Sequence, residues 1–345
     1  MFIHQSILNY WMTKTRDIYI LIGIGLMTML FFGLSLKIGE VKLSYEDIWQ
    51  LLNGGEAANK SWSYILDSRL YRALVAILSG GALAVSGLIL QVFFRNPLAG
   101  PGVLGISSGA SLGVAIVVLG GVSLQGFTGY VTTVFSGLVG ALLILLLLLL
   151  VSKYIKDAVT LLVLGLMLSY FTSAILNVLY QWASVESTRE FVMWGLGSFE
   201  GLNRVQFLIF SLLISLGIMG SLWLIKPLNG LALGTEYATS MGINIKFVNW
   251  IIILITGVLT AIVTVFCGPI GFIGIAVPQL TRIITKSRNH LLIIPFTFIL
   301  GSFLALTADM TIRVLGNNIP LNTATALIGA PIIIWTIFKM NRSGM

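Results

Sequence analysis

The chain has 345 residues, of which 57% are hydrophobic and 9% are charged, and its mean hydropathy is +1.00. Because about 25% of the residues in a soluble domain are charged, this composition excludes a water-soluble fold and indicates a protein that faces lipid. The net charge of +8 does not point to nucleic acid, since the basic residues form no patch with interleaved aromatic residues.

Uncharged stretches long enough to cross a membrane follow one another along the chain. A bilayer core of about 30 Å requires about 20 residues of α-helix. Two long stretches each contain a Pro/Gly interruption and are divided there. The sequence therefore predicts an all-α polytopic membrane protein, a single domain over 1–345, with ten transmembrane helices at 18–36, 73–94, 103–119, 128–152, 158–179, 205–225, 247–266, 271–284, 291–308 and 318–338.

The first predicted span follows basic residues, as the apolar part of a secretory signal does. It is too long for a signal and has no small-x-small cleavage site after Leu36, so we expect an uncleaved helix. Residues 41–58 are too polar to cross the membrane. They are predicted to form a short outer surface helix that starts near Ser44 and stops at Gly54 and Gly55.

The distribution of basic residues predicts the orientation. An even number of spans puts both termini on one side, and the positive-inside rule assigns that side to the cytoplasm. Among the acidic residues, only Asp17, Asp157 and Glu236 then join the cytoplasmic side. The basic residues on that side are Lys14, Arg16, Arg95, Lys153, Lys156, Lys226, Lys246, Arg282, Lys286, Arg288, Lys339 and Arg342.

Five spans precede the loop 181–203 and five follow it, so any similarity between the halves 1–180 and 204–345 must be of inverted topology. The third span of each half is short and follows a Pro/Gly-rich segment. The first break (96–102) contains Asn96, Pro97 and Pro101, and the second break (268–274) contains Gly268 and Pro269. Paired interruptions of this kind point to a transport pathway, because irregular backbone at membrane depth must be buried in protein or line a water-filled cavity. The alternative is that these prolines only end helices at loops.

Small and polar residues recur at helical spacing on two spans. The stripe Gly80, Ala84, Gly87 and Gln91 is assigned to close helix packing. The more polar stripe Gly165, Ser169, Ser173 and Asn177 is a candidate lining for a pathway, with packing as the alternative. One acidic residue, Asp309, stands at the end of the ninth span, and Arg313 four residues later is expected to pair with it rather than to form a proton relay.

Catalytic and metal chemistry find no support in the sequence. One cysteine and two histidines are too few for a disulfide framework, a zinc cluster or an iron–sulfur site, so we expect no metal site. The chain has no G-x-x-x-x-G-K-[ST] phosphate loop and no recognisable Ser/His/Asp motif. We therefore expect a protein that is not an enzyme and that binds no cofactor itself.

Several segments together resemble one known family. Arg69-Leu70-Tyr71-Arg72 precedes SGGALAVSGLILQVFFRNPLAGPGVLGISSGASLG (79–113), and LNGLALGTEYATSMGIN (228–244), GPIGFIGIAVPQLTR (268–282) and TALIGAPIII (325–334) follow in order. This series is similar to the FecCD family, the permease subunits of type II ABC importers for vitamin B12, iron–siderophore complexes and haem. Two departures are Gln279, where the family usually has histidine, and Tyr71, where it usually has proline.

The resemblance implies roles for particular residues. It implies a permease dimer whose fifth and tenth helices line the substrate path, which adds Asn322 and Thr323 to the pathway residues. It implies that Arg69, Arg72 and Arg313 dock carboxylates of an extracytoplasmic substrate-binding protein, with ordinary interfacial anchoring as the alternative. It also implies that the coupling segment (227–246) contacts two cytoplasmic ATP-binding subunits through Gly234, Glu236, Ala238 and Gly242, with a plain surface loop as the alternative.

The resulting hypothesis is a permease in the bacterial cytoplasmic membrane that imports iron–siderophore, haem or cobalamin-like chelates. ATP and Mg²⁺ would be bound by the partner ATPase, and the partner permease would be a second copy or a paralogue. One alternative is a self-sufficient, ion-coupled secondary transporter of inverted-repeat type. A more distant one is an intramembrane enzyme or a structural membrane protein.

Overall fold

The computed structural model describes residues 2–39, 41, 43–52, 61–121, 127–155, 157–285, 287–316 and 319–342. All regular secondary structure in these ranges is helical. Lys156, Lys286 and the predicted helix stop at Gly54 and Gly55 lie outside them. The helices are α1 (Phe2–Lys37), α2 (Tyr45–Leu52), α3 (Ser61–Phe93), η1 (Pro101–Leu104), α4 (Ile106–Val118), α5 (Phe127–Val151), α6 (Ala158–Trp182), α7 (Val185–Gly195), α8 (Arg204–Trp223), α9 (Ile225–Leu233), α10 (Thr235–Ser240), α11 (Ile245–Cys267), α12 (Ile273–Thr285), α13 (His290–Val314) and α14 (Leu321–Arg342).

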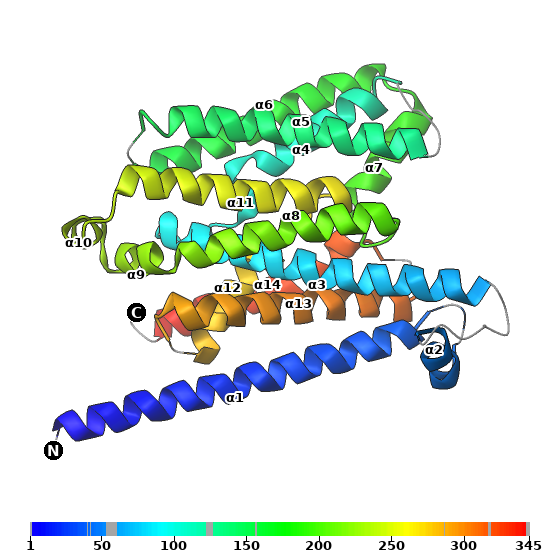
Figure 1. The fold of residues 1–345 in the computed structure, drawn as a ribbon. Coiled ribbons are helices and arrows are strands. Elements are labelled where there is room, and N and C mark those ends of the chain that lie inside the picture. The colour runs from blue at the N-terminus through cyan, green and yellow to red at the C-terminus, as the bar shows by residue number, and fades with distance from the viewer. Residues whose placement is uncertain are drawn as a thin grey trace.

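The long helices run side by side in one elongated bundle (Figure 1). The start of α1, the end of α14 and the short helices α9 and α10 lie at the left end of the view, whereas α2 and α7 lie at the right end. The two ends of the chain therefore lie at the same end of the bundle, as an even number of crossings requires.

Seven of the described helices are long and apolar enough to cross a membrane, namely α1, α3, α5, α6, α8, α11 and α13. Three further apolar stretches are shorter: Ile106–Val118, Ile273–Thr285 and Leu321–Thr336. These segments overlap the ten predicted spans. The chain is a multi-pass membrane protein, and the count of ten crossings stays a prediction because the three short segments fall below the length that spans a bilayer without local thinning.

Two boundaries and one connection differ from the sequence-based prediction. The helix α3 begins at Ser61 rather than at residue 73, and α1 extends back to Phe2, because polar residues at the ends of a span continue the helix beyond the lipid. The predicted loop 181–203 contains the helix α7. The hydroxyl of Ser184 caps this helix by accepting the backbone N–H of Ser187 at 3.1 Å.

The core lies around α3, which packs against α1, α8, α11, α12 and α13. The predicted small-residue stripe on α3 has the packing role that the sequence indicated. A Cβ atom added to Gly80 would overlap the backbone carbonyl of Gly301 on α13, and one added to Gly87 would overlap the carbonyl of Gly274 on α12. These glycines let three helix backbones touch.

The packing of the first half is repeated in the second half. The helix α3 packs against α12 and α13, just as α11 packs against α4 and α5. In the same way, α4 packs against α5 and α6, and α12 packs against α13 and α14. The second long helix of each half, α3 or α11, therefore packs against the short third helix of the other half, α12 or α4. This packing brings the two breaks toward one another.

Candidate functional site

The first break begins where α3 ends at Phe93. Arg95 adopts a left-handed conformation (φ 47°), which turns the chain out of the helix. The Asn96 side chain accepts the backbone N–H of Leu98 at 2.9 Å, and Pro101 opens the single-turn helix η1. Gly105 (φ 75°) ends η1 and starts α4. The prolines predicted to interrupt this span therefore do so, between two buried helices.

The second break follows α11, whose last residue is Cys267. Position 268 requires glycine for two reasons. Its backbone is left-handed (φ 77°), and an added Cβ atom would overlap the carbonyl of Trp194 on α7. The side chain of Asn322, near the start of α14, accepts the N–H of Gly271 at 3.1 Å, and its own N–H donates to the carbonyl of Leu196 at 3.1 Å. The side chain of Asn322 thus ties α14 to the second break, and its backbone N–H, which is the donor to Leu196, ties α14 to the end of α7.

Both breaks line one cavity of about 470 Å³. Its polar groups are the hydroxyls of Ser107, Ser108, Ser169 and Thr260 and the amide of Asn322, and its lining includes no charged side chain. The lining residues are Leu83, Gly100, Pro101, Gly102, Val103, Ser107, Ser108, Leu166, Ser169, Thr260, Pro269, Ile270, Gly271, Phe272, Gly274, Ile275 and Asn322. The interrupted backbone therefore borders an open space within the bundle, which the alternative of simple helix ends did not require.

The predicted pathway residues divide between this cavity and other surroundings. Ser169 and Asn322 line the cavity. Gly165 is buried against η1, where a Cβ atom would overlap the carbonyl of Val103. Ser173, Asn177 and Thr323 are exposed and do not line the cavity. Within the α6 stripe, Gly165 thus packs closely against η1 and Ser169 borders the cavity, and the role of the stripe in a transport pathway stays a prediction.

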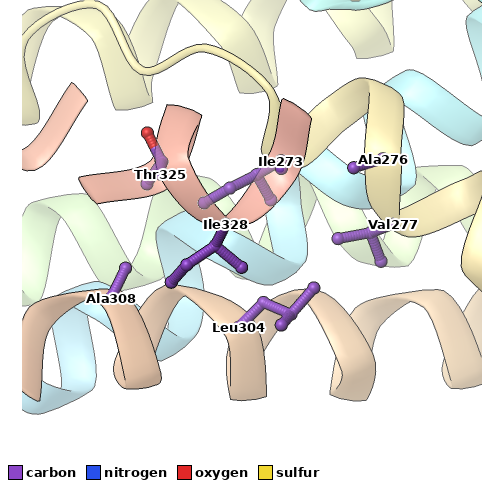
Figure 2. A pocket seen from close by; sticks show the side chains of 8 residues that line it. Ile273, Ala276, Val277, Leu304, Ala308, Thr325 and Ile328 are labelled. Carbon is purple, nitrogen blue, oxygen red and sulfur yellow. The ribbon is translucent and has the colours of Figure 1, made fainter. Parts of the chain in front are cut away.

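A second cavity, between α12, α13 and α14, holds only about 10 Å³ (Figure 2). The side chain of Ile328 on α14 points toward α13, between Ala308 and Leu304. The space accommodates one water molecule at most and is lined almost entirely by apolar groups. It is a packing gap rather than a ligand site.

Two of the three predicted docking arginines, Arg72 and Arg313, bind Asp309, whose carboxylate is 1% exposed, and Arg69 contacts the same end of α1 as Arg313. The Nε atom of Arg72 lies 2.6 Å from one carboxylate oxygen, and the Nε atom of Arg313 lies 2.9 Å from the other. The Asp309–Arg313 pair predicted from their spacing is confirmed. Arg72 also pairs with Glu200, whose side chain is 50% exposed. The cluster has three guanidinium groups and two carboxylates, so it retains positive charge.

Arg69 and Arg313 also hold the end of α1. Arg69 donates to the carbonyls of Leu36 at 3.0 Å and Lys37 at 3.2 Å, and Arg313 donates to the carbonyl of Ser35 at 2.7 Å. Carbonyls in the last turn of a helix have no partner within that helix, so the arginines satisfy them. Arg69, Arg72 and Arg313 are only 8%, 9% and 8% exposed, and all three have partners within the chain.

The coupling segment forms α9, a turn at Gly234 (φ 128°) and α10. Ala238 is fully buried against Gly230 of α9, so it faces the chain itself and not a partner. The exposed side chains of α10 and its end include Glu236, Tyr237 and Met241. The small-residue face predicted for an outside helix is thus partly filled by α9, while Glu236 is on the accessible face.

Two contacts that the sequence did not reveal attach the coupling segment to the long helices. The guanidinium of Arg95 donates to the hydroxyl of Thr235, the first residue of α10, at 3.1 Å. The side-chain oxygen of Asn229 on α9 accepts the backbone N–H of His290 at 2.9 Å and lies 2.7 Å from its Nδ1 atom. The coupling segment therefore contacts both the end of α3 and the start of α13.

The sequence from residue 27 to residue 339 matches the profile of the FecCD transport family. The chain belongs to this family. It is 32% identical over 335 residues to the molybdate import system permease protein MolB of Haemophilus influenzae, with 94% of this chain and 97% of MolB covered. It is 31% identical over 331 residues to the hemin transport system permease protein HmuU of Yersinia pestis, with 94% and 98% covered.

A vitamin B12 import system permease protein, BtuC of Vibrio cholerae, is 32% identical over 334 residues, with 95% of each chain covered. Among solved structures, a metal-chelate type ABC transporter in an inward-facing conformation is similar to this chain with a TM-score of 0.82 and 30% identity. That comparison covers 93% of this chain and 99% of the other. The fold is thus that of an ABC transporter permease, as the resemblance implied.

Proposed function

We propose that this chain is the permease subunit of a binding-protein-dependent ABC importer that moves iron–siderophore or similar chelates into the cytoplasm. The observation that carries the proposal is the single cavity bordered by both breaks, in a chain of the FecCD transport family. Relatives with roughly a third of their residues identical are permease proteins of molybdate, hemin and vitamin B12 systems. The chain itself performs no covalent chemistry, and ATP and Mg²⁺ are bound by separate subunits.

In the membrane, the chain makes ten crossings in two halves of inverted topology, with both termini in the cytoplasm of a bacterial cell. The repeated packing of the two halves supports the inverted arrangement. The position of the first residues of α1 and the last residues of α14 at one end of the bundle supports an even number of crossings. The excess of basic residues near that end supports its cytoplasmic assignment.

The substrate passes between this chain and a second permease, either a copy or a paralogue, along α6 and α14. Ser169 and Asn322 extend from these helices into the cavity, and Ser173, Asn177 and Thr323 lie exposed on the same two helices. Met167 and Phe171 on α6 and Leu327 on α14 are also exposed. A partner permease would cover these faces and enclose the path.

Two cytoplasmic ATP-binding subunits contact the coupling segment through the exposed face of α10. Glu236, Tyr237 and Met241 supply this face, and the turns at Gly234 and Gly242 (φ 78°) set its orientation. Arg95 and Asn229 attach the segment to α3 and α13. A shift of α10 therefore acts on α3, which lines the cavity through Leu83, and on α13, which packs against α3 and α12. Such coupling requires a ligand, here ATP on the partner subunits, that binds the two global states with different affinity.

An extracytoplasmic binding protein docks at the opposite end, on the cluster formed by Arg69, Arg72 and Arg313. Its net positive charge favours carboxylates of a partner, and the planar guanidinium pairs with them bidentately. Glu200 is the exposed member of the cluster, so a partner carboxylate reaches Arg72 by replacing it. Arg69 and Arg313 contribute charge and fix the end of α1.

The cavity lining supports a bulky substrate held by many weak contacts. Hydroxyl and amide groups alternate with apolar ones and no charged side chain is present in the lining, so a small oxyanion would find no cation there to bind it tightly.

Both carboxylate oxygens of Asp309 are engaged by arginines, which leaves this residue unavailable for the ion coupling of a secondary transporter.

Uptake measurements test the proposed substrate class. Cells with and without this chain are given labelled ferric siderophores, haem, cobalamin and molybdate in parallel. The proposal expects chain-dependent uptake of a ferric siderophore or of another chelate. Uptake of molybdate alone would contradict the assignment to chelates while leaving the importer assignment intact.

A further inference from the structure

Two buried glutamines lie between α3 and α12 at the first break. Gln91 is 2% exposed and Gln279 is 4% exposed. The Nε2 atom of Gln279 donates to the carbonyl of Pro97 at 2.5 Å and to the side-chain oxygen of Gln91 at 3.1 Å. The Nε2 atom of Gln91 donates to the carbonyl of Ile275 at 3.1 Å. We call this group of Gln91, Gln279 and the Pro97 carbonyl the amide clasp.

The orientation of both amides follows from their partners. The carbonyls of Pro97 and Ile275 can only accept, so each must face an NH₂ group. The oxygen of Gln91 is then left to accept the second hydrogen of Gln279. Buried amides are costly without partners, and here one side chain joins two helices and the irregular backbone between α3 and η1.

Close backbone approach makes the clasp possible. Gly87 touches the backbone of Gly274, and Gln91 lies one turn later on the same face of α3, where it reaches Ile275. Pro278 precedes Gln279 within α12 and removes one backbone N–H from the helix. The clasp therefore bonds α3 to the part of α12 in which regular helical hydrogen bonding is already interrupted.

The clasp lies between the coupling segment and the cavity. On one side, Arg95 is bonded to Thr235 of α10, and the N–H of Asn96 donates to the carbonyl of Gln91 at 3.2 Å. On the other side, Gly274 and Ile275 form part of the cavity wall, where Ile275 also packs on Gly100. A continuous set of contacts thus runs from α10 through residues 91–97 to the wall.

We propose that the amide clasp transmits movement of the coupling segment to the cavity, with Gln279 as the positioning residue that keeps the first break against α12. This inference rests on the proposed function, because it takes α10 as the segment that the ATPase moves. Without the clasp, α10 and Arg95 move while α12 stays, so ATP is hydrolysed without matching transport.

The test measures transport per ATP hydrolysed in proteoliposomes that contain the whole transporter, its binding protein and a ferric siderophore that the wild-type transporter imports. Gln279→Leu removes the donors at similar volume, and Gln279→Glu replaces them with a carboxylate that faces two oxygen atoms. Each is expected to lower the ratio about tenfold while ATP hydrolysis stays within about twofold of wild type. Gln279→His keeps one N–H for Pro97 and is expected to restore most of the ratio.

The matched control is Thr281→Val, two residues further along α12. It removes a buried hydrogen bond to Thr297 (3.2 Å) that does not touch the first break, so its ratio should equal that of the wild type. If Gln279→Leu does not assemble, Gln91→Met removes the contacts to Gln279 and Ile275 and is expected to lower the ratio likewise. An unchanged ratio in the assembled clasp variants, or an equal fall in Thr281→Val, would overturn the proposal. Failure of the wild-type transporter to couple ATP to uptake would instead contradict the proposed function.

Discussion

The Nε atom of Arg72 on α3 lies 2.6 Å from Oδ1 of Asp309 on α13. The other oxygen of that carboxylate is held by Arg313, which also holds the end of α1. One buried carboxylate therefore keeps two arginines together at the point where three helices meet. The residues that the resemblance assigned to docking also serve the fold, so their effects on stability and on docking must be measured separately.

Replacing Asp309 with alanine should destabilise the protein strongly. The change leaves the buried guanidinium of Arg313 without a counterion and leaves Arg72 with only the half-exposed Glu200, and a broken buried pair costs about 3–5 kcal/mol. The measurement is unfolding of the purified protein in detergent, followed by heat and by denaturant. Glu186→Gln, an exposed acid in the first turn of α7, is the control and should change little. Equal stability of the two variants would show that Asp309 does not hold the cluster.

Replacing Gly87 with alanine should also destabilise the protein. The added methyl group overlaps the carbonyl of Gly274, which must move away from α3, and overpacking of this kind costs about 1–3 kcal/mol. Gly33→Ala is the matched control, because Gly33 is a helical glycine with no neighbouring atom near its added Cβ. Its variant should be at least as stable as the wild type. A thermal shift assay that ranks the two in the opposite order would contradict the packing described here.

The breaks were predictable because proline and glycine act locally. Pro97 and Pro101, and likewise Gly268 and Pro269, belong to short segments rich in both proline and glycine, which end helices, whereas the isolated Pro278 lies inside one. The contacts around the breaks were not predictable in the same way. Gln279 stood out only as a departure from the family pattern, since its partner Pro97 is 182 positions away and only the fold brings them together.

The short helices were the second feature that the sequence did not predict. The small residues at 234, 238 and 242 are spaced for one helix face, but the helix α10 has only 6 residues and folds back on α9, which covers Ala238. The helix α7 was missed because it is amphipathic and too short to resemble a span. In contrast, the Asp309–Arg313 pair depends only on spacing within one helix and was predicted correctly.

The orientation of α10 predicts which positions crosslink to an ATPase subunit. Tyr237 is half-exposed on the accessible face, whereas Ala238 is buried against Gly230. In the assembled transporter, Tyr237→Cys should react with a short thiol crosslinker that reaches the ATPase chain, and Ala238→Cys should not. Crosslinking can be read from a gel after reaction with and without reductant. Efficient crosslinking from 238 with none from 237 would place the partner on the opposite face.

Glu200 should compete with a docked binding protein for Arg72. Removing its charge by Glu200→Gln frees the exposed side of the Arg72 guanidinium, so affinity for the binding protein should rise about two- to tenfold at low salt. Arg72→Glu should lower that affinity instead. Surface plasmon resonance with the immobilised transporter gives both values, with Glu186→Gln as the charge-matched control. Weaker binding by Glu200→Gln would mean that Glu200 helps docking and does not block it.

The central claim is that this chain forms the passage of an importer whose energy comes from ATP hydrolysed on partner subunits. Its most direct test is uptake of a labelled ferric siderophore into proteoliposomes that contain the permease, the ATPase subunits and the binding protein. Uptake should require ATP and the binding protein, and it should be absent with a proton or sodium gradient alone. Uptake driven by an ion gradient through the permease by itself would contradict the account.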